Sequence, residues 1–149
     1  MILVGYIHGL RVSELCKLEW GHVDLDARQL HIRRPQGGNT TVHSLRGDEC
    51  RLLRQLKREA STVDVFTTER GDEFTTGGFA KLIERAGIAA GIPFKVHPHM
   101  LRHSAGFHAI NNDVGIRDLQ MFLGHKSINS TTHYAALASG RSKNIIEKL

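Results

Sequence analysis

The sequence predicts a mainly α-helical protein with one small antiparallel β-hairpin sheet, an α+β fold. Most of the chain carries apolar residues at helical spacing, beginning with residues 1–10. Residues 29–33 and 40–45 instead alternate in strand fashion on either side of turn-forming residues 36–39. With 149 residues, the chain is long enough to bury a core, and we expect one domain.

The remaining elements are predicted from caps, breakers and apolar spacing. In the first half of the chain we expect a helix over 1–10 broken at Gly9, a short helix capped by Ser13, a turn over 21–26 and a helix over 48–58. In the second half we expect a helix capped by Thr75 or Thr76 and ended at 91–93, and a helix from Pro98 to about 111. A helix over 116–123 closed by Gly124 and a last helix capped by Asn129 or Ser130 follow.

Two of these helices have a predicted buried face. The short helix after Ser13 is expected to bury Leu15, Cys16 and Leu18. The helix over 48–58 is amphipathic, and its leucines at 52, 53 and 56 are expected to point inward while its arginines and lysine face solvent.

Composition narrows the class of protein. Twenty Lys and Arg against fifteen Asp and Glu give a formal net charge of +5, which favours polyanionic partners such as nucleic acid. No apolar run is long enough to span a bilayer, and the first residues lack the features of a signal peptide. Two distant cysteines, Cys16 and Cys50, form neither a disulfide framework nor a Cys-rich zinc site, so we expect a reducing, cytoplasmic setting.

The stretch from Pro98 to His103 suggests an anion site. If Pro98 opens a helix, His99 and Arg102 point the same way near the positive helix end, an arrangement that suits a phosphate diester. His99 and His103 could instead form half of a metal site. No glutamate follows His99 as it does in zincins, and spacing supplies no third ligand.

Arg11 is the second arginine of interest. It is predicted to lie at the turn before a short helix, where Glu14 can brace it and its side chain can reach into a cleft. Taken alone, the pair is better explained as a solvated ion pair. In the same way, Tyr134 alone could be a core or surface aromatic residue, and His125 could be a cation at a helix C-terminus.

Four motifs together resemble the tyrosine recombinases, the phage-integrase family. In the family's order and spacing, they are Gly-Leu-Arg-Val-Ser-Glu-Leu at 9–15, His-Met-Leu-Arg-His at 99–103, Leu-Gly-His at 123–125, and Tyr134, nine residues after His125. The stretch from His97 to Phe107 is most similar to the small recombinases that invert fimbrial promoter switches.

The chemistry of this family fits the residues. Displacement at a phosphate diester builds negative charge on the non-bridging oxygens, which two guanidinium groups, here Arg11 and Arg102, can stabilise. Tyr134 would be the nucleophile, forming a 3′-phosphotyrosyl bond and releasing a 5′ hydroxyl. Because the phosphodiester energy is kept in that bond, neither a metal nor ATP is expected.

The resemblance also implies supporting roles and partners. His99 would handle protons near the nucleophile, and His125 would hydrogen-bond the phosphate or position Tyr134. Glu14 and His103 would support these groups. The implied partner is duplex DNA, bound by a homo-oligomer that forms a tetrameric synapse, in the cytoplasm of a bacterium at its nucleoid and away from membranes.

Two features depart from the family pattern. The family carries a lysine on the hairpin that protonates the leaving 5′ oxygen, whereas the matching position here is Gln36 or Gly37. Gln36 can donate only a hydrogen bond, and the nearby guanidinium groups of Arg33 and Arg34 are poor general acids. The alternative reading is therefore a DNA-binding relative with impaired catalysis. The chain also begins almost at the first motif, so we expect the N-terminal DNA-clamping domain to be absent or the chain to be a fragment.

Overall fold

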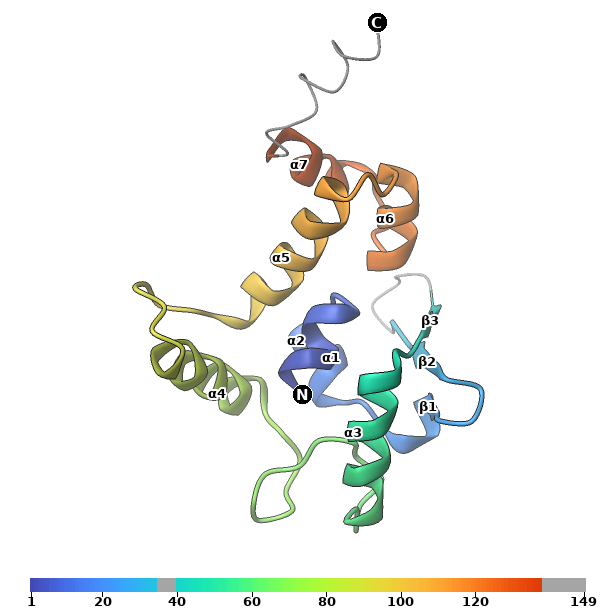
Figure 1. Ribbon diagram of the computed structural model, residues 1–149, viewed down its shortest axis with the longest axis vertical. Coiled ribbons are helices and arrows are strands. Elements are labelled where there is room, and N and C mark those ends of the chain that lie inside the picture. Colours follow the sequence, from blue (N-terminus) through green and yellow to red (C-terminus); the bar gives the residue numbers. More distant parts are fainter. Residues whose placement is uncertain (35–39, 138–149) are drawn as a thin grey trace, which may run out of the picture.

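The structure is a computed structural model that describes residues 1–34 and 40–137 (Figure 1). Its helices are α1 (Ile2–Ile7), α2 (Val12–Cys16), the 3₁₀ helix η1 (Trp20–His22), α3 (Gly47–Arg58), α4 (Thr76–Ala89), α5 (Pro98–Asn111), α6 (Ile116–Leu123) and α7 (Asn129–Leu137). Its strands are β1 (Val23–Asp24), β2 (Gln29–Ile32) and β3 (Thr41–Ser44). The predicted class, mainly helical with a small antiparallel sheet, is confirmed.

The sheet has the order β1-β2-β3, and both pairs of strands are antiparallel. The predicted hairpin is β2 and β3, whose register runs from Gln29 opposite Ser44 to Ile32 opposite Thr41. The turn predicted over 21–26 is wrong in part, because η1 and the short strand β1 occupy most of it. The hairpin turn itself, with Gln36, lies outside the described residues.

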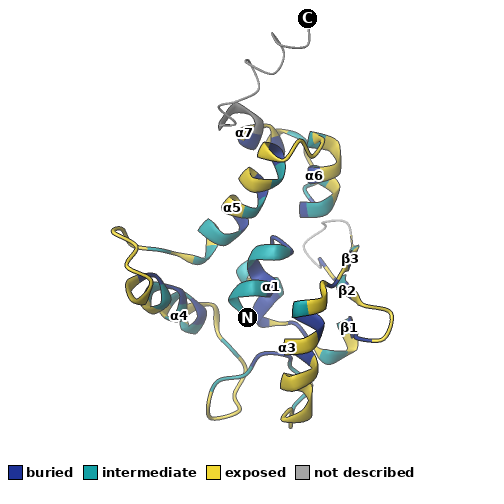
Figure 2. Cartoon of the chain, viewed as in Figure 1, coloured by how far each residue is buried: buried dark blue, intermediate teal, exposed yellow. Residues whose placement is uncertain are grey.

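The larger group of buried apolar side chains joins α1, α2, the sheet, α3 and α4 (Figure 2). Leu15, Leu30 and Phe79 are almost completely inaccessible to solvent. The predicted burial of Leu15, Cys16 and Leu18 is confirmed. Burying such side chains stabilises the fold by roughly 1.5–3 kcal/mol each.

The predicted inner face of α3 is wrong for two leucines. Leu53 is buried, but Leu52 and Leu56 are 45% and 37% exposed. The helix is rotated so that Glu49 and Cys50 point inward together with Leu53. The helix is rotated in this way because Glu49 has buried polar partners. Its carboxylate accepts a hydrogen bond from the backbone N–H of Arg46 and pairs with His8 of the N-terminal segment.

That histidine belongs to a buried network of three titratable side chains. Nε2 of His8 lies 3.0 Å from Oε1 of Glu49, and Nδ1 of His8 lies 3.2 Å from Nδ1 of His43. His43 stacks on Phe122 of α6, with ring centroids 4.2 Å apart. The network thus connects the α1 end, β3 and α3 to the helix that precedes the third motif.

A smaller group of buried side chains lies where α5, α6 and α7 meet, at the upper end of Figure 1. It consists of Ile110, Leu119, Leu123 and Tyr134. Helix α5 runs from this group down to α1, so the second motif on α5 lies between the two groups of buried residues.

Most predicted helix ends are confirmed, with two differences. Thr75 caps α4, its hydroxyl accepting a hydrogen bond from the N–H of Gly78, and Gly124 closes α6 with a φ of 60°. Ser13 does not cap α2, because the helix begins earlier, with Arg11 at the N-cap. Asn129 and Ser130 are instead the first residues of α7. Among the described residues, no helix combines the length and apolarity that crossing a membrane requires.

Candidate active site

The first motif presents Arg11 at the start of α2. The backbone N–H of Arg11 donates to Oε2 of Glu14 at 2.8 Å, and its Nη1 donates to Oε1 at 2.7 Å. The Glu14 side chain is 8% exposed, whereas that of Arg11 is 40% exposed. Glu14 therefore holds both the backbone N–H and the guanidinium of Arg11, while the Arg11 side chain stays partly accessible to solvent. The predicted contact between Arg11 and Glu14 is confirmed.

Arg102 of the second motif lies behind this pair. It is 6% exposed, and its two terminal nitrogens donate to the backbone carbonyls of Gly9 and Leu123. Burial, with help from the nearby positive charge of Arg11, lowers the Arg102 pKa to about 10. The guanidinium still carries its charge at neutral pH. Arg102 thus links the backbone carbonyls beside the first and third motifs, and it lies close enough to Arg11 for the two charges to interact.

His125 of the third motif follows the left-handed Gly124 and is half-buried. Its Nδ1 is hydrogen-bonded to the Thr131 hydroxyl at 2.8 Å. Burial, together with the charges of Arg102 and Arg11, lowers the His125 pKa to about 4. At neutral pH the ring is uncharged, so it acts as a hydrogen-bonding group and not as a cation at a helix end.

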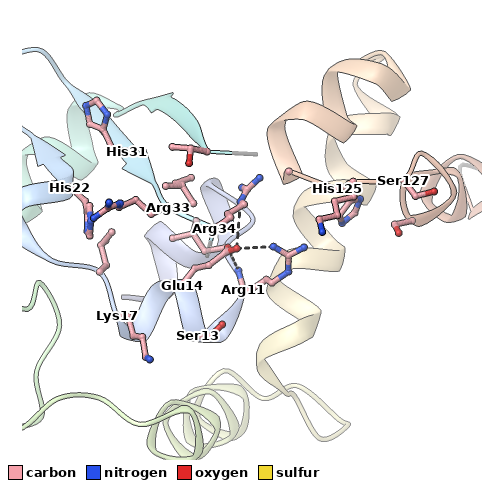
Figure 3. A pocket seen from close by; sticks show the side chains of 17 residues that line it. Arg11, Ser13, Glu14, Lys17, His22, His31, Arg33, Arg34, His125 and Ser127 are labelled. Atoms are coloured by element: carbon pink, nitrogen blue, oxygen red, sulfur yellow. Dashed lines mark hydrogen bonds and ion pairs between the residues drawn. The ribbon is translucent and has the colours of Figure 1, made fainter. Parts of the chain in front are cut away.

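A cleft of about 720 Å³ lies between α2 and the hairpin on one side and the start of the α6–α7 connection on the other (Figure 3). Arg102 does not line it. Arg11, Glu14 and His125 line it. Further basic and polar lining comes from Lys17, Arg33, Arg34, Lys126 and Ser127. A cleft with this charge suits an anionic ligand.

Arg34 is the site residue that the sequence analysis did not select. Its side chain is 1% exposed, lies 3.4 Å (Nε) from Oε1 of Glu14, and donates from Nη2 to the Phe122 carbonyl at 3.2 Å. A signal was present in the sequence: strand alternation from the buried Leu30 and Ile32 places Arg34 on the inner face of the hairpin.

Tyr134 is not part of this cleft. It is 3% exposed, its ring packs on Gly106 of α5, and its hydroxyl is hydrogen-bonded to Nδ1 of His103 at 3.1 Å. Burial raises the Tyr134 pKa, against the opposing effect of the Arg102 charge. The phenol borders a separate pocket of about 570 Å³, which is also lined by Tyr6 and His133. His103, which we expect to support the site, is the residue that contacts the phenol.

His99 is exposed on the first turn of α5, where its nearest aromatic neighbour is His97, with ring centroids 6.5 Å apart. The structure does not place it in the cleft that Arg11 and His125 line. The metal alternative gains no support from geometry: within residues 1–34 and 40–137, no three His, Cys, Asp or Glu side chains are grouped to hold an ion.

The site thus combines the braced Arg11, the buried Arg102 and the uncharged His125 at or beside one basic cleft. The family model described as "Phage integrase family" matches residues 1–141, and the chain belongs to this family. It is 34% identical to the type 1 fimbriae regulatory protein FimE of Escherichia coli K12, over 99% of this chain and 78% of that protein. It is 32% identical to tyrosine recombinase XerA of Thermococcus kodakarensis, over 99% of this chain and 54% of that protein.

Solved structures give the same result. The crystal structure of XerA recombinase superposes with a TM-score of 0.84 at 27% identity, covering 97% of this chain and 55% of that one. XerH recombinase in a post-cleavage complex with its difH substrate has the same fold, with a TM-score of 0.82 over 97% of this chain and 43% of that one. The chain therefore spans about half the length of the Xer proteins it matches. Because homologues across the family are site-specific recombinases, the alternative of impaired catalysis is not favoured.

Proposed function

We propose that this chain is the catalytic domain, over residues 1–149, of a tyrosine site-specific recombinase that breaks and rejoins duplex DNA. The observation that carries the proposal is that Arg11 and His125, from two separate motifs, line one basic cleft, while the buried Arg102 of a third motif holds the backbone carbonyls of Gly9 and Leu123 beside them. A family protein with this cleft has the groups needed to hold a phosphate diester and to stabilise charge on its oxygens.

In the proposed reaction, the Tyr134 oxygen attacks the scissile phosphorus as its proton leaves. The bond from phosphorus to the 5′ oxygen breaks, a 3′-phosphotyrosyl bond forms, and the 5′ oxygen takes up a proton. Arg11 and Arg102 stabilise the charge on the non-bridging oxygens, and the neutral His125 hydrogen-bonds one of them. His99 is proposed to handle protons near the nucleophile, and the Gln36 amide to hydrogen-bond the leaving oxygen. Rejoining is the reverse reaction with a different 5′ hydroxyl.

Tyr134 must change position for this attack, because its hydroxyl contacts His103 and does not line the arginine cleft. The required movement is that of α7, which carries both Tyr134 and the partner of His125, Thr131. Binding of DNA in the cleft would engage His125 and so act on α7 directly. The chain is proposed to act in this way as one of several protomers on paired sites in a tetrameric synapse at the bacterial nucleoid.

The test uses a covalent adduct. Duplexes selected by binding from a random pool would be nicked near the centre of the bound site, incubated with the protein and separated on a denaturing gel. A protein–DNA adduct is expected for the unaltered chain and for Tyr6→Phe, the other of the two tyrosines, and is expected to vanish for Tyr134→Phe. An adduct that survives Tyr134→Phe would overturn the assignment of the nucleophile.

A further inference from the structure

Arg34 occupies a position that the proposed reaction does not yet use. It is the last described residue before the hairpin turn, and its guanidinium lies deep between α2 and α6 (Figure 3). With 5% of its surface exposed, it is as inaccessible as Arg102. A buried guanidinium is costly unless its nitrogens are held by acceptors. Within the described part of the chain, Nη2 of Arg34 is hydrogen-bonded, Nε makes only an ion pair, and Nη1 has no partner.

On one side, Arg34 shares a carboxylate with Arg11. Oε1 of Glu14 accepts a hydrogen bond from Nη1 of Arg11 and lies 3.4 Å from Nε of Arg34. Glu14 thus stands between the half-exposed and the buried arginine, and both fix its orientation. Any movement of Arg34 would be transmitted to Arg11 through this one side chain.

On the other side, Arg34 holds the backbone before His125. Its Nη2 donates to the carbonyl of Phe122, and Nη2 of Arg102 donates to the next carbonyl, that of Leu123. Two arginines from distant parts of the sequence therefore donate hydrogen bonds to the carbonyls of two consecutive residues, immediately before Gly124 and His125.

Gly124 shows how closely the guanidinium approaches this turn. A Cβ atom at Gly124 would overlap the Arg34 side chain, and the φ of 60° is itself one that favours glycine. The third motif can therefore close over Arg34 only because the residue before His125 has no side chain.

We propose that Arg34 is a positioning residue for the phosphate site: by bridging Glu14 to the Phe122 carbonyl, it fixes Arg11 and His125 relative to each other. This proposal rests on the proposed function. It requires a guanidinium, because two different nitrogens of the group, Nε and Nη2, face the Glu14 carboxylate and the Phe122 carbonyl. A lysine keeps the charge but presents a single ammonium and cannot bridge them in the same way.

The first test compares Arg34→Lys and Arg34→Gln with the unaltered protein, using adduct formation in a single turnover at saturating protein. The matched control is Arg51→Gln, an exposed arginine of α3 that does not line the cleft. Both Arg34 variants are expected to slow adduct formation by roughly 10²-fold, as expected for misplaced reacting groups, while DNA affinity changes little. Arg51→Gln should keep the rate. Recovery of the rate by Arg34→Lys would show that only charge matters and would overturn the bridging role, as would full activity of Arg34→Gln.

A second measurement does not depend on activity. The His125 ring would be titrated by NMR. Loss of the Arg34 charge in Arg34→Gln should raise the His125 pKa from about 4, whereas Arg51→Gln should leave it unchanged. An unchanged His125 pKa in Arg34→Gln would contradict the proposed arrangement.

If the Arg34 variants do not fold, the unaltered protein still decides the question. Its Arg34 side-chain N–H protons should exchange slowly with solvent and show a hydrogen bond to the Phe122 carbonyl, and rapidly exchanging, averaged protons would overturn the proposal. Failure of the unaltered protein to form any adduct would count against the proposed function alone, because these NMR results would stand.

Discussion

Substitution of Gly106 by alanine tests how Tyr134 is held. Gly106 is a helical residue of α5, and a Cβ there would lie 2.8, 2.9 and 3.1 Å from Cε1, Cζ and Cδ1 of the Tyr134 ring. Alanine in a helix gains about 1 kcal/mol over glycine, whereas overpacking of this kind costs about 1–3 kcal/mol. We expect a net destabilisation of up to about 2 kcal/mol and displacement of the ring.

The displacement should be visible in the ionisation of the phenol. Tyr6→Phe leaves Tyr134 as the one tyrosine, so ultraviolet absorbance of the phenolate reports it alone. Its pKa is raised by burial in the parent and should fall toward 10 in Gly106→Ala. Adduct formation should become faster, because weaker packing in the buried position makes it easier for the phenol to move to the cleft. A loss of about 1.4 kcal/mol in that packing corresponds to at most roughly a tenfold faster rate.

Gly77→Ala is the matched control, because a Cβ on this glycine of α4 meets no atom within 4 Å. It should stabilise the protein slightly, by up to about 1 kcal/mol, and leave the Tyr134 pKa unchanged. The reasoning would be refuted if Gly106→Ala behaved like Gly77→Ala in both stability and phenol titration.

Three further predictions concern the acid limit of stability, the buried arginine and the DNA contacts. Burial lowers the His43 pKa to about 4, so between pH 6.5 and 4 the unfolded chain binds a proton that the folded chain does not. Denaturant titrations should therefore show that the free energy of unfolding falls by up to about 3 kcal/mol over this range. The fall should be smaller in His43→Leu, and an equal fall in that variant would contradict this account. In Arg102→Lys the lysine cannot reach both the Gly9 and Leu123 carbonyls, so thermal unfolding should show a stability lower by about 1–2 kcal/mol. Single-turnover adduct formation should be at least roughly 10²-fold slower, and a fully active variant would show that the paired contacts are dispensable. Lys126→Gln should reduce the slope of log affinity against log salt for duplex DNA by about 1 in binding titrations, and an unchanged slope would place Lys126 away from the phosphates.

Much of the fold was predictable because its elements carry local signals. Pro98 at the start of α5, Gly124 at the end of α6 and the alternation of β2 each mark an element without reference to the rest of the chain. The rotation of α3 was not predictable in this way. Leucines at 52 and 56 suggest one buried face, but the partner that decides it, His8 for Glu49, is far away in the sequence.

The site shows the same division. The order and spacing of the motifs selected Arg11, Arg102 and His125, and the structure gathers them because α5 crosses between the first and third motifs. The position of Tyr134 depends on how α7 packs on Gly106, which no spacing encodes. The sequence suggests Arg34 only as a poor general acid, because a guanidinium holds its proton tightly. Its alternation with Leu30 and Ile32 predicts its place on the inner face of the hairpin.

The most direct test of the account is to identify the residue that carries DNA after denaturation. The trapped adduct would be digested with protease and nuclease, and the linked peptide sequenced by mass spectrometry. The account predicts a single linkage, between the Tyr134 oxygen and a 3′ phosphate. Linkage at Tyr6 or any other residue, or to a 5′ phosphate, would contradict it.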